Sequence, residues 1–279
     1  MEHTITRADI EQYCRSLLLE ERAAGTVAKY RRDLAAFAAF LSGRSVTRES
    51  AANWKASLQE RGYAPATINA MLSAVNSFFR FMGWGIKLKF LRIQRQLFRD
   101  PARELGRAEY TRLLTAARER GQERLALIME TLCATGIRIS ELRYITAEAA
   151  RKGRTTIALK GKIRTILLPG KLCRKLLKYA KKHRLASGEI FRTKNDKSIS
   201  RRQVWFEMKR LCKAAEVAPD KVFPHNFRHL FATTFYRACR DIARLADLLG
   251  HSSIETTRIY LTVSGAEQAR QLDLLGLVS

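Results

Sequence analysis

Four short segments of the sequence carry residue types that could together perform phosphoryl transfer. In the first, residues 134–142 (ATGIRISEL), Gly136 ends an apolar helix and Arg138 begins the next one. An arginine at a helix N-terminus can bind an anion together with backbone N–H groups. Glu141, three residues further on, lies on the same helical face and could hold the guanidinium in place. An ordinary surface Arg–Glu pair is the alternative interpretation.

The second segment is a basic turn between two β-branched runs. Residues 155–159 and 163–168 each favour a strand, and Lys160-Gly161-Lys162 between them is typical of a hairpin turn. A lysine on such a turn can project into a groove and protonate a leaving oxygen. Either Lys160 or Lys162 could do so, and a merely solvated basic turn is the alternative.

The third segment places two candidate residues on one face of an expected helix. His225 and Arg228 are three residues apart in the string PHNFRH. Arginine offers a planar set of donors that matches a phosphate, and histidine exchanges a proton near neutral pH. His225 and His229 could also bind a metal, but a third ligand and the glutamate of the zinc-protease motif are missing. We therefore expect no metal site.

The fourth segment ends an apolar helix at Gly250, continues with His251 and carries Tyr260 on a second short helix. A lone tyrosine late in a helix usually packs into a core, and that is the alternative here.

Together these residues suit phosphoryl transfer to a protein nucleophile without a metal. Arginines neutralise the nonbridging oxygens and stabilise the pentacoordinate state. Histidine assists deprotonation of a tyrosine, whose ordinary pKa near 10 makes it a poor nucleophile, and lysine protonates the departing 5′ oxygen. The sequence holds no P-loop and no paired carboxylates, which argues against nucleotide hydrolysis and two-metal nuclease chemistry.

Helical patterns dominate the elements that must position these residues. Residues 1–86 predict a bundle of four amphipathic helices joined by short turns, with Asp9 as the cap of the first. Residues 87–104 predict a basic linker, because Asp100-Pro101 breaks any helix there. Residues 105–279 predict a larger, mostly helical domain with one β-hairpin. The expected fold is therefore mainly α, in two domains, with a small β-hairpin in the second.

The charge points to a polynucleotide partner. Lys and Arg number 52 against 26 acidic residues, a formal net charge of +26 and a pI near 10.5. Such a surplus costs self-repulsion in the compact state, and the basic residues are spread along the whole chain, which favours nucleic acid over an anionic membrane. The residues that we expect to contact DNA are Lys87, Lys89, Arg92, Arg95, Lys162, Arg201 and Arg202.

The remaining composition predicts a soluble globular protein of a reducing compartment. Apolar residues make up 46% and charged residues 28% of the chain. No apolar run approaches the ~20 residues needed to span a bilayer, and the N-terminus lacks the pattern of a signal peptide. The five cysteines show no ligand or disulfide spacing, so we expect reduced, buried thiols. A cytoplasmic, nucleoid-associated location is therefore expected.

In this order the four segments resemble the tyrosine recombinase (phage integrase-like) family. The strings ATGxRxSEL, HxFRH and LLGHSSxxTTxxY carry the resemblance. The first 85 residues resemble the family's SAM-like, core-binding DNA-binding domain, and residues from about 105 resemble its catalytic domain. The resemblance implies site-specific cleavage and rejoining of DNA through a 3′-phosphotyrosyl bond, with no cofactor, metal or ATP, since the exchange of one phosphoester for another conserves bond energy.

The resemblance also implies a role for each matching residue. These roles are a phosphate clamp by Arg138 and Arg228, a general acid at Lys160, a general base at His225, a supporting histidine at His251, a nucleophile at Tyr260 and the family's acidic residue at Glu141. We prefer Lys160 over Lys162 because it precedes the glycine of the turn.

Family members close around double-stranded DNA and act as tetramers on two synapsed sites. Residues 265–275 are expected to form the tail helix that such enzymes dock onto a neighbouring subunit, although packing in cis is equally open. The absence of room for an arm-binding domain implies an Xer-like protein or a simple mobile-element integrase. Residues 261–264 depart from the Tyr-Thr-His ending of Xer proteins and favour the latter. A type IB topoisomerase-like enzyme and a non-catalytic DNA-binding relative are the alternatives.

Overall fold

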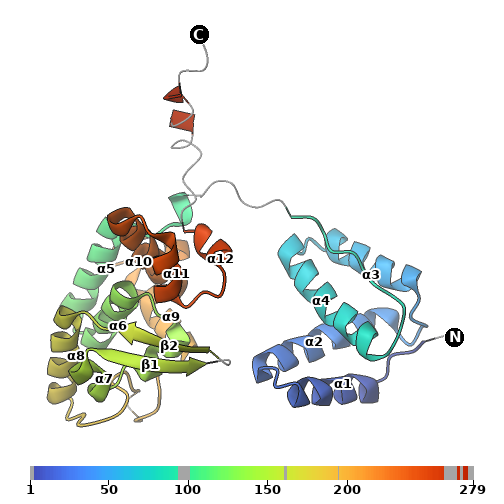
Figure 1. The fold of residues 1–279 in the computed structure, drawn as a ribbon, viewed down its shortest axis with the longest axis horizontal. Coiled ribbons are helices and arrows are strands. Elements are labelled where there is room, and N and C mark those ends of the chain that lie inside the picture. The colour runs from blue at the N-terminus through green and yellow to red at the C-terminus, as the bar shows by residue number, and fades with distance from the viewer. Residues whose placement is uncertain are drawn as a thin grey trace. The chain divides into compact units, whose positions relative to one another are not determined.

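The chain forms two compact units, Met1–Arg95 and Gln96–Ser279 (Figure 1). Each unit has its own hydrophobic core. The computed structural model describes residues 3–93, 101–159, 162–193, 195–260, 269–270 and 273–275. The fold is mainly helical with a single two-stranded sheet among the described residues, which confirms the expected fold class.

The first unit contains the four expected helices. They are α1 (Arg7–Leu19), α2 (Ala24–Leu41), α3 (Arg48–Glu60) and α4 (Pro65–Phe81). Phe37, Trp54 and Phe79 are almost fully buried between them, and the Phe37 and Trp54 ring centroids lie 4.8 Å apart. Aromatic side chains bury a large apolar area per residue, so they account for much of the stability of a unit this small.

The cap expected for α1 is corrected by one turn. Thr6 is the N-cap and accepts a hydrogen bond from the backbone N–H of Asp9, while the Asp9 carboxylate accepts one from the Thr6 N–H at 2.8 Å. Asp9 is therefore the third helical residue of a capping box. An acidic residue in the first turn is favourable at either position, which is why the sequence alone did not separate the two.

The first unit continues past residue 86, into the segment expected to be linker. The Asn76 side chain donates to the Leu88 carbonyl at 2.9 Å and accepts from the Leu88 N–H at 2.8 Å. Asn69 makes the same pair of bonds with Leu91. Leu88 is buried in the core of the unit. These two asparagines on α4 hold the backbone of residues 88–91 alongside the helix, a long-range arrangement that local patterns do not reveal.

The second unit surrounds the central helix α6, on which α5, α8, α9 and α10 pack. Its elements are η1 (Pro101–Arg103), α5 (Arg107–Glu119), α6 (Glu123–Thr135), η2 (Ile139–Tyr144), α7 (Ala147–Lys152), β1 (Arg154–Leu159), β2 (Lys162–Leu167), α8 (Gly170–Lys182), α9 (Arg201–Leu211), η3 (Pro219–Lys221), α10 (Pro224–Cys239), α11 (Ile242–Leu249) and α12 (Ile254–Arg258). Among the described residues no helix is long and apolar enough to cross a membrane.

The expected hairpin is present, with a shorter turn. β1 and β2 pair antiparallel from Arg154↔Leu167 to Leu159↔Lys162, so the backbone of Lys162 belongs to the strand. Residues 160 and 161 lie between the paired ends and outside the described residues. The candidate Lys160 therefore has no described position. Ile157 and Ile166 point inward and bury the hairpin against the core of the unit.

Candidate active site

Arg138 and Glu141 lie at the start of a short 3₁₀ helix, where an α-helix was expected. α6 ends at Thr135, and Gly136 follows it in the left-handed conformation with φ of 62°. Arg138 then caps η2, and its backbone N–H donates to Glu141 Oε2 at 2.7 Å. The Arg138 guanidinium donates to Glu141 Oε1 at 3.3 Å. Glu141 is almost fully buried, whereas the Arg138 side chain is 43% exposed and can reach an external anion.

Gly136 allows α10 to approach this turn closely. A Cβ atom at position 136 would lie 2.3 Å from Cδ1 of Phe231 on α10 and 3.1 Å from the side chain of Leu249. The glycine is thus required both for its positive φ and for the contact. The same approach brings Arg228, on the first turns of α10, to the carbonyl of Gly136.

Arg228 is buried and holds the ends of two helices together. Its Nη1 donates to the carbonyl of Gly136, the C-cap of α6, at 2.5 Å, and its Nη2 donates to the carbonyl of Leu249, the last residue of α11, at 2.7 Å. Nη2 also donates to His251 Nε2 at 2.9 Å. A guanidinium has five N–H donors, so one on Nη1 and the one on Nε remain for the Tyr260 hydroxyl and one further acceptor.

The charge of Arg228 is retained at neutral pH despite its burial. Loss of hydration lowers its pKa to about 10, and the neighbouring Arg138 contributes to the lowering. Interaction with the Tyr260 hydroxyl, which includes a side-chain hydrogen bond, acts in the opposite direction. A group that is cationic at neutral pH therefore lies beside Tyr260 and can pair with an anion there.

His251 is a neutral acceptor that orients Arg228. Because a guanidinium can only donate, His251 Nε2 must accept, and the ring proton therefore resides on Nδ1. Nδ1 lies 2.8 Å from Oγ1 of the fully buried Thr257 and donates to it. Burial lowers the pKa of His251 to about 4, and Arg228 and Arg138 contribute to the shift.

Tyr260 lies just past the end of α12, the short helix that was expected to carry it, and it is buried. Its ring is 3% exposed and packs with Ala232, Leu245 and Leu249 in a small separate core. Histidine rings surround it: the centroid distances are 5.2 Å to His229, 6.0 Å to His251 and 6.4 Å to His225. Here core packing and a chemical environment coincide, so the two interpretations of this tyrosine are not exclusive.

His225 is the exposed histidine of this group. It lies in the first turn of α10 next to Pro224. Partial loss of hydration lowers its pKa, and Arg228 and Arg138 lower it further. The ring is therefore neutral near pH 7 and able to accept a proton. We refer to Arg138, Glu141, His225, Arg228, His251 and Tyr260 as the Tyr260 cluster.

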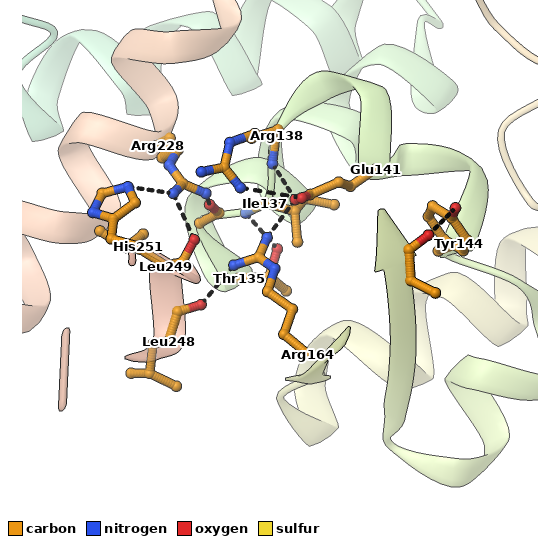
Figure 2. Close-up of polar contacts among 12 residues, drawn as sticks. Thr135, Ile137, Arg138, Glu141, Tyr144, Arg164, Arg228, Leu248, Leu249 and His251 are labelled. Carbon is orange, nitrogen blue, oxygen red and sulfur yellow. Dashed lines mark hydrogen bonds and ion pairs between the residues drawn. The ribbon is translucent and has the colours of Figure 1, made fainter. Parts of the chain in front are cut away.

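Arg164 is a member of this neighbourhood that the sequence reasoning missed. It lies on β2, its Nη2 donates to Glu141, and its Nη1 donates to the carbonyl of Leu248 at 2.9 Å (Figure 2). The strand pattern contained a signal, because residue 164 is in phase with the buried Ile166 and Leu168. An arginine on the inward face of a strand requires a buried acceptor.

The residues expected to contact DNA are distributed over both units. Lys87, Lys89 and Arg92 lie in the extended segment after α4, and their side chains are exposed. Arg201 and Arg202 are exposed on the first turn of α9, where Arg202 lies 5.5 Å from the Phe206 ring and not against the Tyr260 cluster. Arg95 lies outside the described residues, and so does the side chain of Lys162.

The depressed pKa of His251 predicts acid sensitivity. Below its ordinary pKa of 6.5 the unfolded chain takes up a proton that the folded site excludes until about pH 4. Stability should therefore fall by about 1–2 kcal/mol between pH 7.5 and 5, after a discount for partial exposure of the ring. His251→Gln keeps an acceptor for Arg228 without the titration, and it should weaken that loss by the same amount. Urea denaturation of both proteins at the two pH values measures their free energies of unfolding. An equal loss of stability in the wild type and in His251→Gln would contradict the assignment.

Known proteins share this sequence and fold. The phage integrase family matches residues 103–267, and the N-terminal SAM-like domain of phage integrases matches residues 10–84. Tyrosine recombinase XerA of Pyrococcus furiosus is 30% identical over 94% of this chain and 92% of its own length. Tyrosine recombinase XerC of Roseiflexus castenholzii is 32% identical over 90% of this chain and 87% of its own length.

Solved structures agree on the fold. The site-specific recombinase XerH, bound to its difH substrate before cleavage, aligns with a TM-score of 0.70 and 18% identity over 95% of this chain and 84% of that one. The Tn1549 transposon integrase, in complex with circular intermediate DNA, aligns with a TM-score of 0.72 and 17% identity over 96% of this chain and 99% of that one. The chain therefore belongs to the phage integrase family, as a tyrosine recombinase of the Xer and integrase type.

Proposed function

We propose that this recombinase cleaves and rejoins DNA at specific sites through a covalent 3′-phosphotyrosyl bond to Tyr260, without metal or ATP. The observation that carries the proposal is the placement of the Tyr260 hydroxyl beside Arg228, which is charged at neutral pH and keeps two N–H groups, beyond its bonds to Gly136, Leu249 and His251, for Tyr260 and a phosphate. In the proposed step the Tyr260 oxygen attacks the phosphorus and loses its proton, while the bond to the 5′ oxygen breaks and that oxygen gains a proton.

Arg138 and Arg228 would bind the two nonbridging oxygens. They differ in how firmly the protein holds them. Arg228 is fixed by three protein acceptors, whereas the Arg138 guanidinium is bonded to Glu141 and otherwise exposed. A preorganised donor stabilises developing charge without reorganisation, and an exposed one can adjust to the incoming phosphate. Both guanidinium groups bind the pentacoordinate state more strongly than the starting phosphodiester, because that state carries an additional negative charge.

The two histidines of the cluster suit different tasks. Both ring nitrogens of His251 are engaged, by Arg228 and by Thr257, so this residue positions and does not transfer protons. His225 is exposed and neutral near pH 7, which fits a general base for the Tyr260 hydroxyl. Lys160 remains the proposed general acid on the strength of the sequence alone, since it lies outside the described residues.

The net charge of +26 supports binding to many phosphates of double-stranded DNA. We expect affinity to fall about 10³-fold or more between 50 and 200 mM salt, with a log–log slope near −0.9 per phosphate contacted. Lys89→Ala should reduce the magnitude of the slope by about one without changing which site is preferred. Filter binding across a salt series measures this. A slope below about two would exclude an extensive phosphate interface.

Assembly and biological role are finer parts of the proposal. We propose a tetramer on two synapsed sites, formed through a tail helix in residues 265–275, which lie mostly outside the described residues. We also propose that the enzyme is a cytoplasmic, nucleoid-associated integrase of a mobile element. The solved transposon integrase with the same fold was in complex with transposon DNA, which supports a reaction of that kind.

The covalent intermediate provides the test. Nicked duplexes tiled across the DNA that flanks the encoding gene would be incubated with the enzyme in EDTA. Cleavage near the nick releases a short 5′-hydroxyl fragment, and because this fragment diffuses away, the adduct cannot be religated. We expect a protein–DNA species on a denaturing gel, with the nucleotide mapped to the peptide that contains Tyr260. Tight binding across all the duplexes without any adduct would contradict the proposal.

A further inference from the structure

Arg164 introduces a third guanidinium into the neighbourhood of the Tyr260 cluster. It lies on β2 opposite Ile157, and its side chain is only 13% exposed. Burial lowers its pKa, as does the nearby charge of Arg138, whereas Glu141 opposes the shift. Keeping a cation in this place costs desolvation energy, so its partners must stabilise the charged form.

Two donors of Arg164 are bonded to protein groups, one to a carboxylate and one to a backbone carbonyl. Nη2 pairs with Glu141 Oε2, and Nη1 donates to the carbonyl of Leu248, in the last turn of α11, at 2.9 Å (Figure 2). The C-terminal end of a helix carries partial negative charge, so a cation there is favoured. One side chain thus neutralises a buried carboxylate and the end of α11.

The absence of a side chain at Gly250 makes room for Arg164. A Cβ atom at residue 250 would lie 2.5 Å from Cδ and 3.0 Å from Nε of Arg164. Gly250 also adopts a φ of +63°, which favours glycine. The aliphatic part of Arg164 therefore occupies the space left by the absent side chain of Gly250. Its guanidinium donates to the carbonyl of Leu248, so the end of α11 contacts the arginine at both places.

Glu141 links Arg164 to Arg138 through hydrogen bonds. Its Oε2 accepts both from Arg164 and from the backbone N–H of Arg138, and its Oε1 accepts from the Arg138 guanidinium. Glu141 is 2% exposed, so water cannot replace a lost partner easily. The direction in which the Arg138 side chain leaves η2 thus depends on a carboxylate that Arg164 holds.

We propose that Arg164 is a positioning residue that acts through Glu141 to orient Arg138 toward the reacting phosphate. The proposal rests on the proposed cleavage reaction. The bonds of Arg164 go to Glu141 and Leu248, and its stem packs on Gly250, so the role proposed for it is exerted through Glu141. It therefore links strand β2 and the end of α11 to the phosphate-binding side of the cluster.

A double-mutant cycle tests this route. Arg164→Met keeps the stem and removes the donors, and we expect the single-turnover rate of adduct formation to fall by roughly 10- to 100-fold with DNA affinity changed less than about twofold. In an Arg138→Ala background the same substitution should change the rate by less than about twofold, because the residue through which it acts is absent. Arg164→Lys, which keeps one charged donor, should recover part of the rate.

The controls separate this proposal from the reaction on which it rests. Arg154→Met removes an exposed arginine from the same hairpin and should leave the rate unchanged. If the wild type forms no adduct, the cleavage reaction itself is refuted. If the wild type forms the adduct, two results overturn only the positioning role. One is an Arg164→Met variant that reacts at the wild-type rate. The other is a double variant whose rate is reduced by the full product of the two single reductions. Should Arg164→Met unfold, shown by its thermal melt, Arg164→Lys is used in the same cycle, with the same two outcomes.

Discussion

Replacing Tyr260 with phenylalanine is expected to abolish covalent adduct formation while leaving DNA binding within about twofold of the wild type. The substitution removes one oxygen atom and no ring carbon, so packing against Ala232, Leu245 and Leu249 is preserved. No other group in the variant can supply the attacking oxygen at that position, and the adduct band on nicked DNA in EDTA should fall below detection. A gel-shift assay on the same duplexes measures binding.

Tyr236→Phe is the matched control for this prediction. Tyr236 packs against the same small core as Tyr260 but lies on α10. Its variant should form the adduct at the wild-type rate. An adduct that persists in Tyr260→Phe, or that disappears equally in Tyr236→Phe, would remove Tyr260 from the role of nucleophile.

Replacing Arg228 with alanine is expected to lower the cleavage rate by about 10³-fold, the upper end of what loss of one oxyanion donor costs. Two causes combine. The phosphate loses its preorganised cation, and the carbonyls of Gly136 and Leu249 together with His251 Nε2 lose their buried donor. The second cause should also destabilise the catalytic unit by on the order of 3–5 kcal/mol. Single-turnover cleavage well below the melting temperature and a urea titration measure the two effects separately.

The conservative and control variants show which cause dominates. Arg228→Lys retains the charge but offers three donors without the planar geometry, so we expect most of the stability to return and most of the rate to remain lost. Arg237→Ala removes an exposed arginine from the last turn of the same helix and should change neither. Cleavage by Arg228→Ala within tenfold of the wild type would contradict a role in phosphate binding.

The sequence by itself determined the features that depend on neighbours along the chain. The helices of the first unit were predictable because amphipathic spacing and a helix-starting Pro65 act within a few residues. The order of chemical residue types was readable for the same reason, since Arg138 with Glu141, and His225 with Arg228, are three positions apart. Local strings therefore identified the family.

Only the tertiary structure decided how those residues act on one another. The bonds from Arg228 to Gly136 and to Leu249 join residues 92 and 21 positions apart, and Arg164 reaches Leu248 across 84 positions. The neutral state of His251, the burial of Tyr260 and the position of Arg164 follow from these bonds. Hydrogen bonding and desolvation depend on distance in space, and the packing of α10 on α6 through Gly136 sets that distance. The strand periodicity places Arg164 on the inward face, but no periodicity names the partners of such a contact, which is why its bonds to Glu141 and Leu248 were recognisable only in the folded chain.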